Sequence, residues 1–176
     1  MSHAGWRLCP RCGAALALGV PAGEEEERLH CPACGLVLYD NPAPTASALV
    51  ERDGRVMLTR RGIEPGRGLW DMAGGFVEPG EDPLETVRRE LREETGLDVD
   101  VDDLVGCYPD VYGATGTATL NLFYRAHVVG GAEAAASSDV AAVGWFDPAE
   151  LPLDGFAFAC CARAARDYLH RFVKSL

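Results

Sequence analysis

Hydrophobic and polar residues change their spacing along the chain, and these changes predict its secondary structure. Residues 46–51 and 56–60 are rich in apolar residues and flank Asp53-Gly54, a pair typical of the tight turn of a β-hairpin. Short or alternating apolar stretches predict further strands at 70–73, 117–129 and 140–146.

Two stretches have helical spacing instead. Residues 82–95 begin with Asp82-Pro83, a capping residue followed by one that suits the first helical turn, and Gly96 suits the left-handed end of a helix. Residues 158–172 predict a final amphipathic helix. Because strands and helices mix without regular alternation, the pattern predicts an α/β sandwich with a mixed sheet.

The first part of the chain has a different character. It contains two Cys-x-x-Cys-Gly motifs, at 9–13 and 31–35, separated by a run of glutamates. The prolines of residues 41–44 interrupt regular structure and predict a linker. We therefore expect a small domain at 1–40 and a larger domain at 41–176.

The cysteine motifs predict a structural zinc site in the small domain, which would then be a zinc ribbon. Two such motifs can place four thiolates tetrahedrally around one ion, and the glycines let backbone amides turn toward the sulfurs. A redox pair is the alternative, but one redox site would not need two matched motifs. Four protein ligands close the coordination sphere, so this zinc should not be catalytic. The expected ligands are Cys9, Cys12, Cys31 and Cys34.

Charge and composition narrow the class of protein. A formal net charge of -11 argues against a broad surface that neutralises nucleic-acid phosphates, so phosphate contacts should use bound cations or a few arginines. No apolar run is long enough to span a bilayer, and the first residues lack the apolar core of a signal peptide. We expect a cytoplasmic protein that binds neither a membrane nor nucleic acid.

The predicted helix at 82–95 carries candidate metal ligands. Glu90, Glu93 and Glu94 are spaced so that they project from neighbouring positions on one face. Like charges at this spacing repel unless a divalent cation lies between them, and carboxylate oxygens suit magnesium or manganese rather than zinc. A solvated acidic face is the usual alternative, and the glycine-rich loop before the helix argues against it.

This stretch resembles the Nudix box, and the chain is therefore similar to Nudix hydrolases. Every fixed position of the 23-residue pattern is filled: Gly75-x5-Glu81-x7-Arg89-Glu90-Leu91-x-Glu93-Glu94-x-Gly96-Leu97. The resemblance implies the Nudix α/β/α sandwich, with the box as a loop, a helix and a second loop. It extends, much more loosely, from about Thr45 to the end of the chain.

The resemblance also implies roles for the residues of the box. Glu90, Glu93 and Glu94 would bind Mg²⁺ or Mn²⁺, with the backbone carbonyl of Gly74 as a further ligand. Glu81 and Arg89 resemble positions that brace the loop and orient the carboxylates, and Gly75 and Gly96 hold fixed structural positions of the box.

Cleavage of a diphosphate needs a base as well as cations. The cations would neutralise the phosphate oxygens and lower the pKa of a water molecule, from which a carboxylate then removes a proton. Glu93 or Glu94 could be that base. Nudix enzymes often take it from a later loop, where Asp139 is the candidate; a structural Asp that caps the loop is an equal alternative.

A zinc ribbon before a Nudix domain resembles the NADH, ADP-ribose and FAD pyrophosphatases. The SQPWPFPxS segment usual in the NADH group is missing, and Cys107-Tyr108-Pro109 stands in the region after the box. The expected reaction is hydrolysis of the diphosphate in a nucleoside diphosphate linked to another group, with release of a nucleoside monophosphate.

Residues outside the box must choose the substrate. Arg60 or Arg61 could meet a phosphate, and Tyr108 or Tyr112 could stack on a base. Each of the four also has an ordinary interpretation as a surface or core residue.

Two other functions stay open at this point. The chain could be a house-cleaning nucleoside triphosphatase that uses the same box. It could also be a regulatory protein that senses a nucleotide with a Nudix fold. The family further leads us to expect a homodimer.

Overall fold

The computed structural model describes residues 3, 5–114, 116–131, 134–136 and 139–173. The chain divides into two compact units, Met1–Pro42 and Ala43–Leu176. None of the described helices is long and apolar enough to cross a membrane.

The first unit is a small antiparallel sheet in the order β1-β2-β3. Its buried side chains, within the described residues, are Cys9, Pro21 and Cys31. A unit with so little aliphatic core requires another source of folding energy. The strands are β1 (Ala17–Gly19), β2 (Arg28–His30) and β3 (Val37–Leu38).

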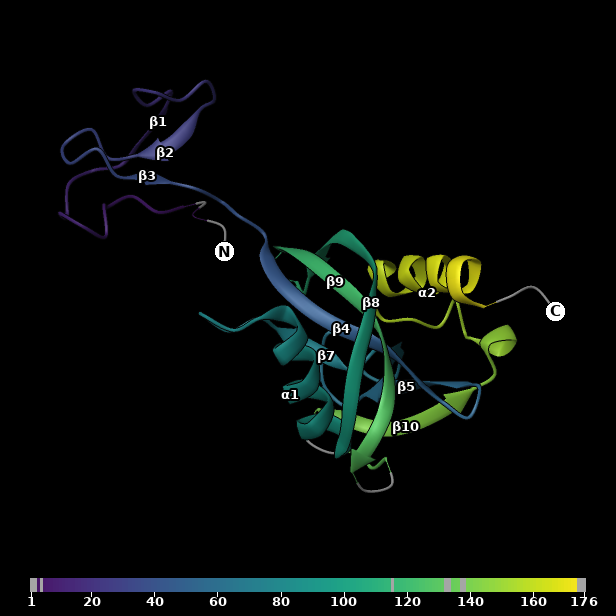
Figure 1. Ribbon diagram of the computed structural model, residues 1–176. Helices are drawn as coiled ribbons and strands as arrows, with labels where there is room; N and C mark the ends of the chain where they lie inside the picture. Colours follow the sequence, from purple (N-terminus) through teal and green to yellow (C-terminus); the bar gives the residue numbers. More distant parts are fainter. Residues whose placement is uncertain (1–2, 4, 115, 132–133, 137–138, 174–176) are drawn as a thin grey trace. The chain divides into compact units, whose positions relative to one another are not determined.

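The second unit is built on a mixed sheet in the order β10-β5-β4-β9-β8 (Figure 1). Strands β4 and β9 run parallel, whereas the other pairs are antiparallel. Two short strands, β6 and β7, pair with β5 and β4 respectively. The strands are β4 (Ala43–Arg52), β5 (Arg55–Arg61), β6 (Trp70–Asp71), β7 (Gly74–Phe76), β8 (Leu97–Tyr112), β9 (Thr117–Gly131) and β10 (Val140–Phe146).

Helices α1 (Pro83–Thr95) and α2 (Ala159–Phe172) cover opposite faces of this sheet (Figure 1). Val87 and Leu91 of α1 pack in one hydrophobic cluster, and Ala164 and Tyr168 of α2 pack in another. A short 3₁₀ turn, η1 (Pro148–Glu150), precedes α2. The predicted α/β/α sandwich is confirmed.

The ends of α1 follow the sequence prediction. Asp82 caps the first turn, where its side chain accepts a hydrogen bond of 2.8 Å from the amide of Leu84. Gly96 has a φ of 72° and closes the helix with a hydrogen bond from its amide to the carbonyl of Arg92. The hairpin around Asp53-Gly54 also forms as predicted, between β4 and β5.

Strand β8 was not predicted. Its sequence mixes several aspartates with Gly106 and Pro109, which are rare inside strands. The structure accommodates them because β8 is an edge strand, and its pairing with β9 shifts register at three points. Proline and bulges are tolerated at such an edge, so the alternation that would mark the strand is interrupted.

Candidate functional site

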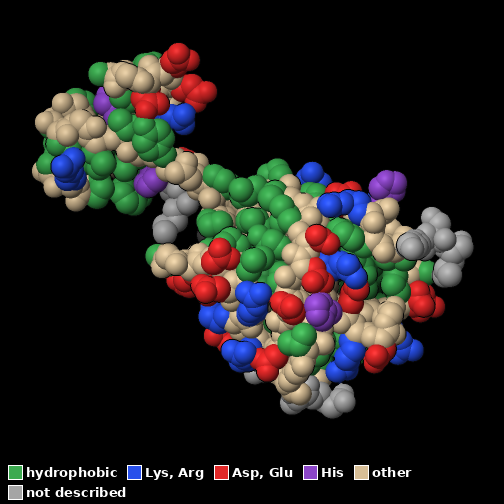
Figure 2. All heavy atoms as spheres, viewed as in Figure 1, with side chains coloured by type: hydrophobic (Ala, Val, Ile, Leu, Met, Phe, Trp, Pro, Cys, Tyr) green, Lys and Arg blue, Asp and Glu red, His purple; other side chains and the backbone are tan. Residues whose placement is uncertain are grey.

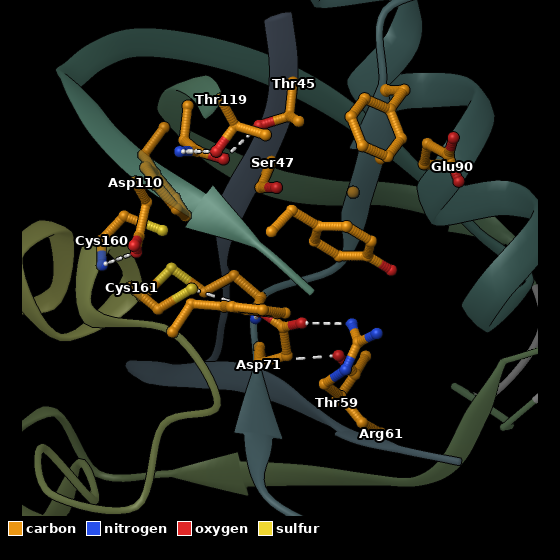
Figure 3. Close-up of a pocket in the computed structure, with 18 of the residues that line it drawn as sticks. Thr45, Ser47, Thr59, Arg61, Asp71, Glu90, Asp110, Thr119, Cys160 and Cys161 are labelled. Atoms are coloured by element: carbon orange, nitrogen blue, oxygen red, sulfur yellow. Dashed lines mark hydrogen bonds and ion pairs between the residues drawn. The ribbon is translucent and has the colours of Figure 1, made fainter. Parts of the chain in front are cut away.

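A cavity of about 300 Å³ opens on the second unit, a size that suits a small ligand. Its walls come from the sheet strands, the loop before α1, helix α1 itself and the start of α2. Figure 3 shows Glu90 on one side, Asp71 and Arg61 on another, and Thr45 and Thr119 at a third position. Charged, neutral polar and aromatic side chains therefore line the same cavity.

An ion pair fixes the loop before α1 to the helix. The guanidinium of Arg89 donates from Nε and Nη2 to the two carboxylate oxygens of Glu81, at 2.8 and 3.0 Å. Thr86 donates to the same carboxylate at 2.7 Å. The hydrogen bonds from Arg89, followed by that from Thr86, lower the pKa of Glu81 to about 2. The bracing role that the resemblance implied for Glu81 and Arg89 fits this geometry.

Arg89 also reaches two of the candidate metal ligands. Its Nη1 donates to Glu90 at 2.8 Å and lies 3.5 Å from Glu93. The side chain of Glu93 is 59% exposed and does not line the cavity, whereas Glu90 and Glu94 do. The structure therefore brings two of the three predicted carboxylates to the cavity wall.

Glu94 is partly buried where it meets the loop. The amide of Gly74 donates to it at 3.3 Å. Burial, together with the nearby charge of Glu90, raises the pKa of Glu94 to about 8. Gly74 also lines the cavity, and its carbonyl stays a predicted ligand.

Gly75 makes room for Glu90. A Cβ atom at this position would overlap the carboxylate of Glu90. The glycine of the box thus has a steric reason, because a side chain here would displace a candidate ligand.

The carboxylates at the cavity suit magnesium, an ion that proteins usually bind with an incomplete set of protein ligands. Within the described residues, the four cysteines are the only group of three or more Cys, His, Asp or Glu side chains whose ligand atoms lie close enough together to share one ion. Magnesium usually takes one or two carboxylates and completes its coordination with water and substrate phosphate oxygens. Glu90 and Glu94, open to the cavity, match that partial ligand set.

A partly buried ion pair forms another wall. Arg61 Nη1 lies 2.8 Å from Asp71 Oδ2, and Arg61 Nε donates to the carbonyl of Pro65 at 2.6 Å. The thiol of Cys161 donates to Asp71 at 3.2 Å. Burial raises the pKa of Asp71 despite these partners. Sequence reasoning found Arg61 but missed Asp71, since a lone acid in a short strand gives no pattern.

The other predicted residues separate into two groups. Tyr112 and Asp139 line the cavity, and the backbone carbonyl of Asp139 accepts a hydrogen bond from Gly62. Arg60 is not part of the lining; it donates to the carbonyl of Gly68. Tyr108, expected as a base-stacking residue, is only 5% exposed in the core, with its hydroxyl bound to Asp167. A ring so buried presents no face to a base.

The four cysteines of the first unit form a compact cluster. The Sγ atoms of Cys9 and Cys34 are 3.7 Å apart, those of Cys12 and Cys31 are 3.5 Å apart, and all four lie within 4.8 Å of one another. Four sulfurs at 2.3 Å from a central zinc would lie about 3.8 Å apart. The cluster therefore fits a tetrahedral zinc ion.

Comparison with known families agrees with both units. A model described as NUDIX domain matches residues 41–161, and one described as Nudix N-terminal matches residues 7–40.

Several curated proteins and solved structures are similar to this chain. An ADP-ribose pyrophosphatase of Methanocaldococcus jannaschii is 35% identical over 115 residues, 65% of this chain and 68% of that protein. An NAD-capped RNA hydrolase NudC of Chromobacterium violaceum is 34% identical over 146 residues, 83% of this chain. The match covers only 52% of that protein, so the chain spans about half its length. The crystal structure of a NUDIX hydrolase from Nitrosomonas europaea superposes with a TM-score of 0.77 at 25% identity, covering 95% of this chain and 92% of that one.

Gly75→Ala should weaken divalent-cation binding with little loss of stability. The new methyl group displaces the flexible end of Glu90, not backbone atoms. We expect Mn²⁺ affinity, measured by electron paramagnetic resonance, to fall about tenfold or more. Gly130→Ala is the matched control, because its Cβ would meet Asp98 at an ordinary 3.6 Å. Equal Mn²⁺ affinities in the two variants would contradict the steric role of Gly75.

Cation affinity should depend on pH through Glu94. Its carboxyl group has a pKa of about 8 without a cation, so it is mainly protonated below pH 8, and a cation must displace that proton. Apparent Mn²⁺ affinity should therefore rise about tenfold per pH unit below pH 8 and level off above it. Glu94→Gln should flatten this dependence; an unchanged slope in the variant would assign the proton to another group.

Proposed function

The chain belongs to the Nudix hydrolase family, and we propose that it hydrolyses the diphosphate of a nucleoside diphosphate linked to another group. ADP-ribose, NADH and FAD represent the substrate class, and a nucleoside monophosphate is one product. One observation carries the proposal: Glu90 and Glu94 share a ligand-sized cavity with Arg61. Carboxylates that can hold a cation thus face the same space as a side chain that can meet a phosphate.

The proposed reaction depends on Mg²⁺ or Mn²⁺. When bound, the cations would neutralise the phosphate oxygens and lower the pKa of the attacking water. Glu90 and Glu94 would hold them, with Glu93 and the carbonyl of Gly74 as further ligands. Arg89 keeps the carboxylate of Glu90 in place through its 2.8 Å contact.

Arg61 is suited to orient the substrate. Its guanidinium is already fixed by Asp71 and the carbonyl of Pro65, so little side-chain entropy is lost when it binds a phosphate oxygen. Asp139, at the cavity, is the proposed base that removes a proton from water, with Glu93 and Glu94 as alternatives.

The substrate class is supported by the similar proteins. One is named an ADP-ribose pyrophosphatase, and others are named NAD-capped RNA hydrolases. We propose free nucleotides of this class rather than capped RNA. The chain has a net charge of -11, and Figure 2 shows acidic and basic side chains intermingled over the visible face of the second unit. A cytoplasmic location and a homodimer complete the proposal.

Glu94→Gln should abolish most of the turnover, by about 10²-fold or more, because the amide is a poor ligand for a hard cation. Glu93→Gln should also lower it. The measurement is a panel of ADP-ribose, NADH, FAD and nucleoside triphosphates with Mg²⁺, in which mass spectrometry identifies both products.

Glu85→Gln is the matched control, since Glu85 is an exposed residue of the same helix outside the proposed ligands. Full turnover in Glu94→Gln would sink the proposed chemistry. A preference for triphosphates would keep the chemistry and replace the substrate class.

We also propose that the first unit binds one structural zinc ion. Cys31→Ser should reduce the zinc content, measured by atomic absorption, from about one ion per chain to near zero, because three thiolates leave the sphere open. Cys107→Ser should retain the metal, since Cys107 is an exposed cysteine outside the cluster. Zinc lost equally from both variants would contradict the assignment.

A further inference from the structure

One wall of the cavity consists of neutral polar side chains that the proposed chemistry does not use. Thr45 on β4 lies opposite Asn121 on β9, and Asn121 lies opposite Tyr108 on β8. Thr119 is the next residue of β9 on the same face of the sheet. Thr119 is 3% exposed and Asn121 is 9% exposed, yet both line the cavity together with Thr45.

Hydrogen bonds fix the orientation of the Asn121 amide and the direction of the Thr45 hydroxyl. The backbone carbonyl of Tyr108 can only accept, so the Nδ2 of Asn121 faces it, at 3.0 Å. The same nitrogen donates to the hydroxyl of Thr119 at 3.0 Å. The Oδ1 of Asn121 then faces Thr45, whose hydroxyl must donate to it, at 2.7 Å.

With these hydrogen bonds in place, one threonine can only accept a hydrogen bond from a ligand and the other can donate one. Thr45 has used its proton, so its oxygen can only accept a further hydrogen bond. Thr119 has accepted a hydrogen bond, and the structure records no acceptor for its own proton within the described residues. The wall therefore presents an acceptor and a donor, held apart by one asparagine.

Aromatic rings stand beside this pair. Phe76 on β7 lies opposite Thr45 in the sheet, and Tyr112 contacts it edge-to-face with ring centroids 5.5 Å apart. Both rings line the cavity. The two rings are nearly perpendicular, so a planar ligand could stack on one of them while its edge meets the two hydroxyls.

We propose that Thr45 and Thr119 read the hydrogen-bonding edge of adenine. The amino group of the base donates to Thr45, and the neighbouring ring nitrogen accepts from Thr119. Hypoxanthine places a carbonyl where adenine has its amino group, so it meets Thr45 with acceptor against acceptor. This specificity rests on the proposed function, because it places the nucleoside of the substrate in this cavity.

The test compares AMP and IMP binding by calorimetry without divalent cations, so that no hydrolysis is required. Wild-type protein should bind AMP about tenfold or more tightly than IMP. Thr45→Val and Thr119→Val keep the side-chain shape, and each should weaken AMP binding about tenfold with little change for IMP. Thr45→Ser and Thr119→Ser keep the hydroxyls and should retain the preference.

A purely structural role would give a different result. If the three residues only tie β4, β9 and β8 together, the valine variants lower both affinities equally or melt at a lower temperature with no change in the AMP-to-IMP ratio. That outcome, or equal binding of AMP and IMP by wild-type protein, overturns the inference.

A parallel measurement of kcat/KM for ADP-ribose and its hypoxanthine analogue separates this inference from the proposed function. Hydrolysis of both at equal rates would leave the function standing and remove the adenine reading. Preferential binding of AMP without hydrolysis of any diphosphate would remove the proposed function and leave the adenine specificity standing.

Discussion

Several carboxylates must share a small and partly buried volume, and the rest of the site is arranged around their mutual repulsion. Arg89 offsets part of that charge by binding Glu81 with two hydrogen bonds and Glu90 with a third. Partial burial of Glu94 and the uncompensated charge of the nearby Glu90 raise the pKa of Glu94. Because Arg89 does not compensate all of this negative charge, the site favours a divalent cation over a neutral ligand. The loop, its glycines and the helix cap all serve to hold these charges at fixed positions.

Local patterns in the sequence were sufficient to predict helix α1 and the positions of its glutamates. Asp82, Gly96 and the spacing of the glutamates act within a few residues, so their meaning does not depend on distant parts of the chain. The cysteine motifs are equally local, and the two knuckles close in the same way: Gly13 and Gly35 share a φ of 74°. The structure adds the sulfur–sulfur distances into which a zinc ion fits.

The remaining parts of the site depend on contacts between distant segments. Asp71 becomes a wall of the cavity only because β6 pairs with β5 and brings it to Arg61. The role of Asn121 depends on its neighbours on β4 and β8, which are distant in sequence. Tyr108 and Tyr112 are four residues apart, yet one is buried and the other faces the cavity. No local pattern distinguishes them: Tyr108 is bound by Asp167 of α2, whereas Tyr112 packs against Phe158 just before that helix.

The division of labour between helix α1 and strands β4 and β9 has an evolutionary consequence. The residues proposed to hold the cations lie on the helix and its loop, whereas those proposed to read the base lie on the sheet. Substitutions on the sheet can therefore change the preferred nucleoside without altering the groups that hold the cations. A gene encoding such a scaffold can diverge toward new metabolites by a few point changes, each intermediate remaining a working hydrolase.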